Sequence, residues 1–492
     1  MKKQVFNPYL PFWETVPDGE PHIFDGRVYV YGSHDRLNGT LFCEDDYVGW
    51  SAPVDDLTDW RYEGVIYKKS QDPINGAPYG RQMPPWEKGF AVDQHCLYAP
   101  DVAQGPDGRY YLYYALDGVN VISVAVCDTP AGSYEFLDYV LYEDGRLPEA
   151  GRLFDPAILC EESGNYLYYG FCPDGHFPGM GDRNMDGAFM VRLADDMHTV
   201  ISAPKLVANG IESAKGTSYE AHPFFEASSI RHFGDWYYFV YSSLQGNELC
   251  YGMAKGPEGP FDFKGVIISN GDMGYQGNTL PVNYMGNNHG GLVSIKDQPY
   301  IFWHRQTHGN SYSRQGCADK VTILPDGTIP QTEITSCGLN DGPLTTKCRY
   351  EAYIACHLTG PDRSAVGNVA MSFPGTPLPK LPEDMPYITE EACPDGEKGL
   401  KPYIYNLCAR AIAGFKYLDF DGSETAVDVE LRGHGTMTVH LDSPEGTVIG
   451  RMACDSGHWT MVSADIKKTS GTHAVYFIPE DGTVDFAGFE FK

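Results

Sequence analysis

The sequence has no long apolar run and few basic residues for its length. No stretch is long enough to span a bilayer, and Lys2 and Lys3 are not followed by the apolar segment of a signal peptide. The 36 lysines and arginines face 66 acids, which gives a formal net charge of −30. Such a surface repels nucleic acids and anionic lipids. We therefore expect a cytoplasmic protein whose partners are neither nucleic acids nor membranes.

Cysteine pairs and histidine clusters with metal-binding spacing are also missing. The 13 cysteines form no CxxC pair, and we find no pair of histidines spaced as in a zinc site. Without an export signal, these cysteines are expected to be reduced and mostly buried thiols. Neither a disulfide framework nor a zinc motif is predicted.

What the chain does contain is aromatic strand material cut by turn residues. Of its 492 residues, 34 are tyrosines, 55 are glycines and 35 are prolines, and long amphipathic helical patterns are rare. Tyrosine-rich runs bounded by glycine and proline predict strands and turns. The length suggests two or three domains. We therefore predict an all-β protein.

Five strand runs share one form, in which a turn residue precedes alternating tyrosines and aliphatic residues. These runs are residues 26–31, 108–114, 164–169, 234–241 and 297–303. Each is followed by a further strand-like segment, a polar turn and an edge-like piece. Five such units predict a five-bladed β-propeller. A pair of β-sandwiches is the alternative.

One ionisable residue precedes the first strand of each unit by six to nine positions. These residues are Glu20, Asp101, Asp155, Glu226 and His289. In a propeller the innermost strands surround the central channel, so these side chains are expected to converge at its mouth. Four acids and a histidine in register therefore predict a site on the propeller axis.

Clustered carboxyl groups favour acid–base chemistry. Glu226 lies among small and aromatic residues, which should raise its pKa and let it donate a proton near neutral pH. Like charges push pKa values apart and leave one group as acid and another as base, as glycoside hydrolysis requires. One alternative is a structural ion pair between Glu226 and Arg231. The other is a metal site, although the tight Asp/Asn/Gly loops of calcium sites are not evident.

Seven short motifs carry a resemblance to glycoside hydrolase family 43 over roughly residues 8–335. They are GEPHI at 19–23, YGSHD at 31–35, YAPDV at 98–102, FDP at 154–156, FEASSIR at 225–231, NHGG at 288–291 and WHR at 303–305. The resemblance implies a five-bladed propeller that cleaves arabinofuranosides, xylosides and related sugars by an inverting mechanism.

Carried over from that family, three acids receive roles. Glu226 would be the general acid, Asp155 would orient that acid and tune its pKa, and Glu20 would be the general base. The family usually has Asp at the base position, so Glu20 is a departure from its pattern. Asp35 and Asp101 are the reserve candidates for the base and are otherwise expected to bind substrate.

The resemblance also assigns His289 and Arg305. His289 would lie on the axis beside an ion, often calcium, or would be a neutral histidine hydrogen-bonded in the channel. Arg305 ends an apolar strand and would contact the sugar. The chemistry itself should require no cofactor, and a structural calcium on the axis is the one ion considered.

The composition changes after residue 337, which predicts two domains, 1–337 and 338–492. Residues 358–400 are rich in Pro, Gly, Asp and Glu, and alternating strand patterns return from Tyr403 to the end. Strands of this length with glycine-rich turns predict a β-sandwich. The segment GTHAVY at 471–476 and the closing FEF resemble carbohydrate-binding modules of family 6. A purely structural role for this domain is the alternative.

Together these observations predict an inverting glycoside hydrolase that acts on an oligosaccharide substrate. We expect release of a terminal pentose, above all α-L-arabinofuranose, from short oligosaccharides. A β-xylosidase or galactofuranosidase on the same scaffold and a non-catalytic sugar-binding propeller are the alternatives. The sequence leaves the oligomeric state open.

Overall fold

The computed structural model describes residues 4–76, 94–173, 185–365, 381–393 and 399–492. Almost all of its regular structure is β-strand. The helical elements are single turns, such as η1 (Lys69–Gln71), α1 (Pro73–Gly76), η3 (Tyr275–Gly277), η4 (Ala352–Ile354) and η5 (Arg363–Ala365). Within the described ranges, no helix combines the length and the apolar character needed to cross a bilayer. The predicted all-β class is confirmed.

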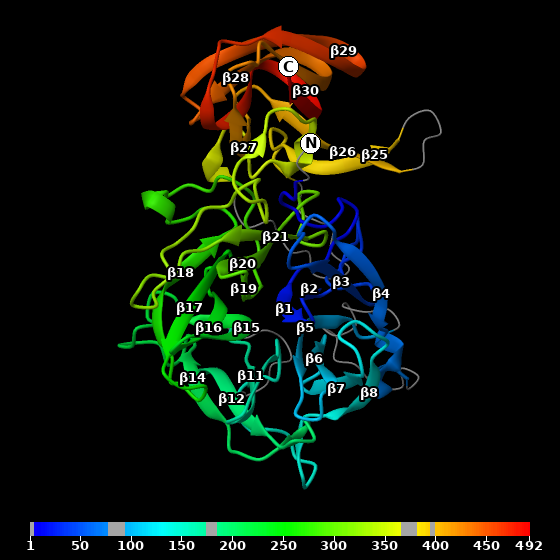
Figure 1. Cartoon of the computed structure of the whole chain (residues 1–492), viewed down its shortest axis with the longest axis vertical. Helices are drawn as coiled ribbons and strands as arrows, with labels where there is room; N and C mark the ends of the chain where they lie inside the picture. The colour runs from blue at the N-terminus through cyan, green and yellow to red at the C-terminus, as the bar shows by residue number, and fades with distance from the viewer. Residues whose placement is uncertain (1–3, 77–93, 174–184, 366–380, 394–398) are drawn as a thin grey trace.

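Five sheets, antiparallel except for the parallel β9–β13 pair, are arranged around a common centre and form the first two thirds of the chain (Figure 1). The first two sheets consist of β1 (Glu20–Phe24), β2 (Arg27–Tyr31), β3 (Tyr47–Pro53) and β4 (Arg61–Tyr67), then β5 (Leu97–Gln104), β6 (Tyr110–Leu116), β7 (Ile122–Cys127) and β8 (Glu135–Tyr139). The third consists of β9 (Leu141–Tyr142), β10 (Ala157–Glu161), β11 (Gly164–Tyr169), β12 (Gly187–Leu193), β13 (Thr199–Val200) and β14 (Lys205–Asn209). The last two consist of β15 (Phe224–Phe233), β16 (Trp236–Ser243), β17 (Glu248–Ala254) and β18 (Asp262–Ser269), then β19 (Leu292–Ile295), β20 (Gln298–Arg305) and β21 (Gln315–Lys320).

These sheets are the blades of a five-bladed propeller, as predicted, and the alternative of two β-sandwiches is wrong. In the first four blades the turn glycine of the repeat lies between the two innermost strands. Gly26, Gly108, Gly164 and Gly234 all adopt positive φ, which glycine tolerates and most residues avoid. The repeat therefore marks the inner hairpin of each of these blades.

The N-terminal segment closes the ring against the fifth blade. The backbone N–H of Tyr9 donates to the carbonyl of Gly316 in β21. The Asn7 amide nitrogen donates to the carbonyls of Ala318 and Thr335, and its oxygen accepts the N–H of Ala318. Residues from the two ends of the propeller are therefore joined side by side.

The C-terminal region forms a second all-β body with its own core. Its strands are β22 (Leu344–Thr345), β23 (Tyr350–Glu351), β24 (His357–Thr359), β25 (Tyr387–Ala392), β26 (Leu400–Cys408), β27 (Ile412–Phe420), β28 (Ala426–Leu441), β29 (Thr447–Asp465) and β30 (Gly471–Phe491). The long strands β28 and β30 pair along most of their length, and β27 pairs with β30. Phe415, Phe477, Phe486 and Phe489 pack against one another inside this body.

The two bodies share an apolar and polar interface. Phe12 and Tyr284 of the propeller belong to the same buried cluster as the C-terminal core. Phe12 packs edge-on against Tyr353, with ring centroids 5.0 Å apart. Lys416 of β27 forms a 2.8 Å ion pair with Glu333. The apolar side chains of the propeller at this interface are therefore part of the core of the C-terminal region.

Candidate active site

Four of the five blades have a strained residue where the innermost strand begins. Asp18, Ala99, Asp155 and Ala227 all have positive φ, between 20° and 69°. Asp18 and Asp155 each stand two residues before an inner strand, β1 and β10. Ala99 and Ala227 lie at irregularities in the pairing of β5 and β15. Because such backbone is unfavourable for residues other than glycine, its repetition marks a place where geometry is held for function.

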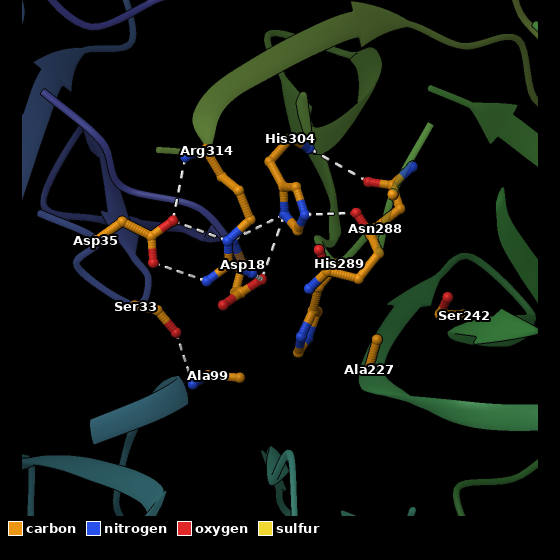
Figure 2. Close-up of polar contacts among 12 residues, drawn as sticks. Asp18, Ser33, Asp35, Ala99, Ala227, Ser242, Asn288, His289, His304 and Arg314 are labelled. Atoms are coloured by element: carbon orange, nitrogen blue, oxygen red, sulfur yellow. Dashed lines mark hydrogen bonds and ion pairs between the residues drawn. The ribbon is translucent and has the colours of Figure 1, made fainter. Parts of the chain in front are cut away.

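Asp18 is held in place by Arg314, which Asp35 holds in turn (Figure 2). Arg314 Nε and Nη2 donate to the two oxygens of Asp35 at 2.8 and 2.9 Å, and Nη1 donates to Asp18 Oδ1 at 2.9 Å. All three residues are buried. The planar guanidinium group suits a two-oxygen contact to one carboxylate. Arg314 therefore fixes the position of the Asp18 carboxylate.

His304 completes the surroundings of Asp18 as a neutral ring. The Asp18 backbone N–H donates to His304 Nδ1 at 3.2 Å, and Nε2 donates to the Asn287 carbonyl at 2.7 Å. These two bonds require the neutral tautomer protonated on Nε2. Burial lowers the pKa of His304 to about 3, which agrees with that tautomer.

The surroundings of Asp18 favour its charged form. Burial alone would raise its pKa, but the positive charge of Arg314 and a hydrogen bond from Ser33 help to bring the pKa below its usual value. Asp18 is therefore an ionised carboxylate at neutral pH.

Glu226 and Asp155 have the opposite character. Burial raises the pKa of Glu226 to about 8, and the negative charge of Asp18 adds to the effect. Burial and the neighbouring Glu226 raise the pKa of Asp155 well above its usual value. Asp155 also accepts the backbone N–H of Ala227, next to Glu226, at 2.8 Å. This pair of carboxyl groups therefore retains a proton near neutral pH, and Glu226 is partly exposed to solvent.

Glu20, expected as the base, is paired with Arg231. Its Oε2 accepts from Arg231 Nη2 at 2.6 Å and from Ser229 Oγ at 3.1 Å, and the residue is 1% exposed. Burial nevertheless raises its pKa to about 8. Arg231 thus pairs with Glu20, and the alternative of a Glu226–Arg231 ion pair is wrong.

Asp101, expected to bind substrate, connects blades instead. Its Oδ1 lies 2.6 Å from Nε2 of His22 in β1, and its Oδ2 accepts the Ile158 N–H of β10 at 2.8 Å. The side chain has no exposed surface. Asp35 is likewise buried and engaged with Arg314, so both acids act through other residues.

Arg305 is bonded to the C-terminal region. Its guanidinium group donates to Gln315 Oε1 and to the carbonyls of Tyr353 and Ala355 in the C-terminal region. The residue is 2% exposed. This placement contradicts a sugar contact for Arg305 and makes it part of the interface between the two bodies.

His289 lies between Glu20 and Asp155, and Figure 2 shows it beside Asp18. Its Nε2 is 3.9 Å from Glu20 Oε1 and its Nδ1 is 3.8 Å from Asp155 Oδ2. Both Nε2 and Glu20 Oε1 are buried without a hydrogen-bond partner. Calcium requires about six to eight oxygen ligands, whereas this gap offers one carboxylate oxygen and one nitrogen beside the cationic Arg231. These residues alone do not fit a calcium site.

Sequence reasoning missed Asp18, Arg314 and His304. Asp18 was detectable, because it stands eight residues before Gly26, as Glu226 stands eight before Gly234 and His289 eight before Asp297. Glu20 stands only six before Gly26. Arg314 and His304 reach the site from the last blade, and no local motif connects them with Asp18.

The chain is similar in sequence to several known proteins. The family model described as glycosyl hydrolases family 43 matches residues 54–329. A xylosidase/arabinosidase of Thermoclostridium stercorarium is 48% identical over 97% of this chain and 96% of its own length. An arabinoxylan arabinofuranohydrolase of Paenibacillus polymyxa is 25% identical over 93% of this chain and 69% of its own length.

Solved structures match the fold as well. A β-xylosidase/α-arabinofuranosidase from a compost microbial metagenome, in complex with xylotriose, superposes with a TM-score of 0.51 at 25% identity over 68% of this chain and 98% of that chain. An exo-β-1,3-galactanase of Phanerochaete chrysosporium has the same TM-score at 13% identity and covers 100% of this chain and 98% of that one. On the family match and the 48% identical relative together, the chain belongs to family 43 of the glycosyl hydrolases.

Proposed function

We propose that this protein is an inverting glycoside hydrolase that removes a terminal pentose from short oligosaccharides. The observation that carries this proposal is the division of charge on the propeller axis. Asp18 is held ionised beside Arg314, while Glu226 and Asp155 retain a proton. A charged base and a protonated acid in one site are the two groups that single-displacement hydrolysis uses.

In this mechanism Glu226 donates its proton to the oxygen of the departing group. The carboxyl group is neutral near pH 7 because of burial and the negative charge of Asp18. Asp155 supports it in two ways. The two neighbouring carboxyl groups cannot both ionise freely, so the pair keeps a proton, and the bond from the Ala227 N–H to Asp155 fixes the backbone beside the acid.

Asp18 is the proposed general base, in place of Glu20. It takes a proton from the water molecule that attacks the anomeric carbon on the face opposite Glu226. A base for this step must be ionised and oriented, and Arg314 and His304 supply both conditions. Glu20 is committed to Arg231 and is not open to a sugar. Inversion calls for acid and base carboxyl groups about 6.5–9.5 Å apart.

The proposed glycone is α-L-arabinofuranose, with β-D-xylose as the second candidate. Two relatives support this proposal. The 48% identical relative is described as a xylosidase/arabinosidase, and the 25% identical relative is described as an arabinoxylan arabinofuranohydrolase. Both sugars are neutral pentoses, which is compatible with a chain whose formal net charge is −30.

The test is hydrolysis of aryl and natural α-L-arabinofuranosides, β-D-xylosides and β-D-galactofuranosides by wild type and Glu226→Gln. We expect turnover of one pentoside, with loss of about 10²–10⁴-fold in kcat on the natural substrate in the variant. Proton NMR of the first-formed sugar should show inverted anomeric configuration. Sugar binding without turnover of any member of the panel would favour the rival, a non-catalytic binding propeller.

We also propose a domain boundary at residues 337–338 and a mainly structural role for the C-terminal region. β21 ends at Lys320, and β22, which begins at Leu344, pairs with β27 of the second body. The Trp459 ring, the natural candidate for sugar stacking, is approached by Arg432 at 4.4 Å and by Lys401 at 4.5 Å. A ring covered by side-chain cations is poorly placed to stack on a sugar. A resemblance to carbohydrate-binding modules of family 6 therefore does not require that this region bind carbohydrate.

A further inference from the structure

Two groups of three metal-ligating side chains converge among the described residues. One is Glu20, His22 and Asp101 on the axis, and the other is His222, Glu248 and Cys250 in the fourth blade. Arg231 occupies the first group, with Nη2 2.6 Å from Glu20 and 3.3 Å from His22 Nε2. A guanidinium ion there opposes binding of another cation. The second group has a different character.

The second group brings nitrogen, oxygen and sulfur to one point. His222 Nδ1 lies 2.5 Å from Glu248 Oε1, Cys250 Sγ lies 3.4 Å from the same oxygen, and Cys250 Sγ lies 4.0 Å from His222 Nδ1. Glu248 and Cys250 are two positions apart in β17 and so face the same side of the sheet. His222 approaches from the turn that precedes β15.

One of these three separations matches a tetrahedral site, and the other two, 2.5 and 4.0 Å, differ from it by less than about 1 Å. With zinc bonds of about 2.0–2.3 Å, neighbouring ligand atoms stand about 3.3–3.6 Å apart. The sulfur–oxygen distance already meets that value. The nitrogen–oxygen distance is short because a proton now joins the two atoms, and an ion replacing that proton would move them apart.

The environment also suits a metal ion. Ser243 Oγ donates to Glu248 Oε1 at 2.6 Å. A hydrogen bond of this kind to a metal-binding carboxylate would hold it in the orientation that the ion needs. His222 packs flat against Phe263, with ring centroids 5.0 Å apart, which fixes the imidazole plane. The His222 side chain is 29% exposed and gives access from solvent, whereas Cys250 is fully buried.

We propose that His222, Glu248 and Cys250 bind a divalent transition-metal ion of the zinc class, with water as the fourth ligand. Thiolate, imidazole and carboxylate together are a borderline-soft set that selects such ions over calcium or magnesium. Without an ion, burial and the Glu248 charge keep the pKa of the Cys250 thiol well above its usual value. Binding therefore releases the thiol proton to solvent, and the proton between His222 Nδ1 and Glu248 moves to solvent or to Nε2 of the same ring. The ion would clamp the turn before β15 to β17, and β15 also carries Glu226.

The chain offers a matched control. His232 Nδ1 lies 2.6 Å from Glu161 Oε1, which reproduces the histidine–carboxylate pair, and the pair belongs to no three-ligand group among the described residues. Cys317 is also a buried thiol, and its sulfur donates to the Gln315 carbonyl rather than to a metal-ligating side chain. Its substitution therefore controls for the loss of one buried thiol. Neither substitution, His232→Gln or Cys317→Ser, touches the proposed ligands.

The experiment is titration of the metal-free full-length protein with cobalt(II), read by absorption spectroscopy. One equivalent should give the intense visible absorption of tetrahedral cobalt and an ultraviolet thiolate charge-transfer band. Cys250→Ser should lose that band. His222→Gln and Ser243→Ala should weaken cobalt binding by at least about tenfold. The two controls should match wild type, and zinc should raise the Tm of wild type and of the controls.

Two results would overturn the proposal. One is the absence of a thiolate band in wild type, and the other is a band that persists in Cys250→Ser. Should Cys250→Ser fail to fold, the result for His222→Gln decides, because the partly exposed imidazole can be replaced without opening a fully buried cavity. Full cobalt affinity in His222→Gln would then contradict the site.

Discussion

Asp18 and Glu226 are both buried carboxyl groups, yet their surroundings move their pKa values in opposite directions. Arg314 donates to Asp18, and no comparable cation pairs with Glu226 among the ion pairs of the described residues. The same burial therefore produces an anion in one place and a neutral acid in the other. This difference, rather than the identity of either residue, makes the site fit for acid–base catalysis.

The pH dependence of kcat/KM follows from these directions. Glu226 must be protonated, so activity should fall as pH rises through about 8. Asp18 must be ionised, so the acid limb should lie below the usual range of an aspartate. A pH–rate profile of wild type measures both limbs.

Asp155→Asn serves as the check on that profile. It removes the neighbouring carboxyl group that cannot ionise together with Glu226, so the alkaline limb should move to lower pH and kcat should drop. An alkaline limb that does not move in Asp155→Asn would mean that Asp155 does not tune the acid.

Arg314→Leu should affect both stability and catalysis. Two buried carboxylates, Asp18 and Asp35, would lose their cation, which should lower the free energy of unfolding by about 3–5 kcal/mol. The acid limb should also move to higher pH in whatever activity remains, because the pKa of Asp18 is no longer lowered. Urea unfolding and the pH profile measure the two effects. Arg314→Lys keeps the charge and should retain more of both, whereas equal losses in the two variants would contradict an electrostatic role.

At the scale of elements, the closure of the ring depends on the N-terminal segment. The side chain of Asn7 makes three contacts with backbone groups of Ala318 and Thr335, and a fourth with Asp319. Asn7→Ala would leave buried donors and acceptors without partners, so the free energy of unfolding should fall by about 2–4 kcal/mol. Urea unfolding measures this change.

The exposed Lys215→Ala is the reference substitution for that experiment. A loss in Asn7→Ala no larger than in Lys215→Ala would show that the ring is closed by other contacts.

The blades themselves could be predicted from sequence, and the ends of their strands could not. Alternating tyrosines after a turn glycine specify an inner hairpin, because period-two burial and positive φ are local properties. Arg314 and His304 come from the last blade and meet Asp18 of the first, across almost 300 positions of sequence. Arg305, two residues from the end of a predicted apolar run, looked like a ligand until tertiary contacts with Tyr353 and Ala355 accounted for its donors.

At the scale of the whole molecule, the propeller and the C-terminal region form one folded unit. Removal of residues 338–492 would expose Phe12 and Tyr284 and deprive Arg305 of two carbonyl acceptors. We expect the truncated propeller to aggregate or to lose its cooperative thermal transition, since buried apolar area and a buried cation would both be uncovered. Size-exclusion chromatography and calorimetry test this. A monodisperse, active propeller of residues 1–337 would contradict it.

The central claim is that Asp18, and not Glu20, draws the proton from the attacking water. Asp18 lies two residues before β1, and Glu20 is the first residue of that strand. Both are buried and both bond to an arginine, so Asp18→Asn and Glu20→Gln are a matched pair of variants. The most direct measurement is kcat of the two variants on the natural pentoside, with folding checked by circular dichroism. We expect Asp18→Asn to lose about 10²–10⁴-fold in kcat, and Glu20→Gln to stay within about tenfold of wild type. The reverse order of losses would contradict the account and return the base to Glu20.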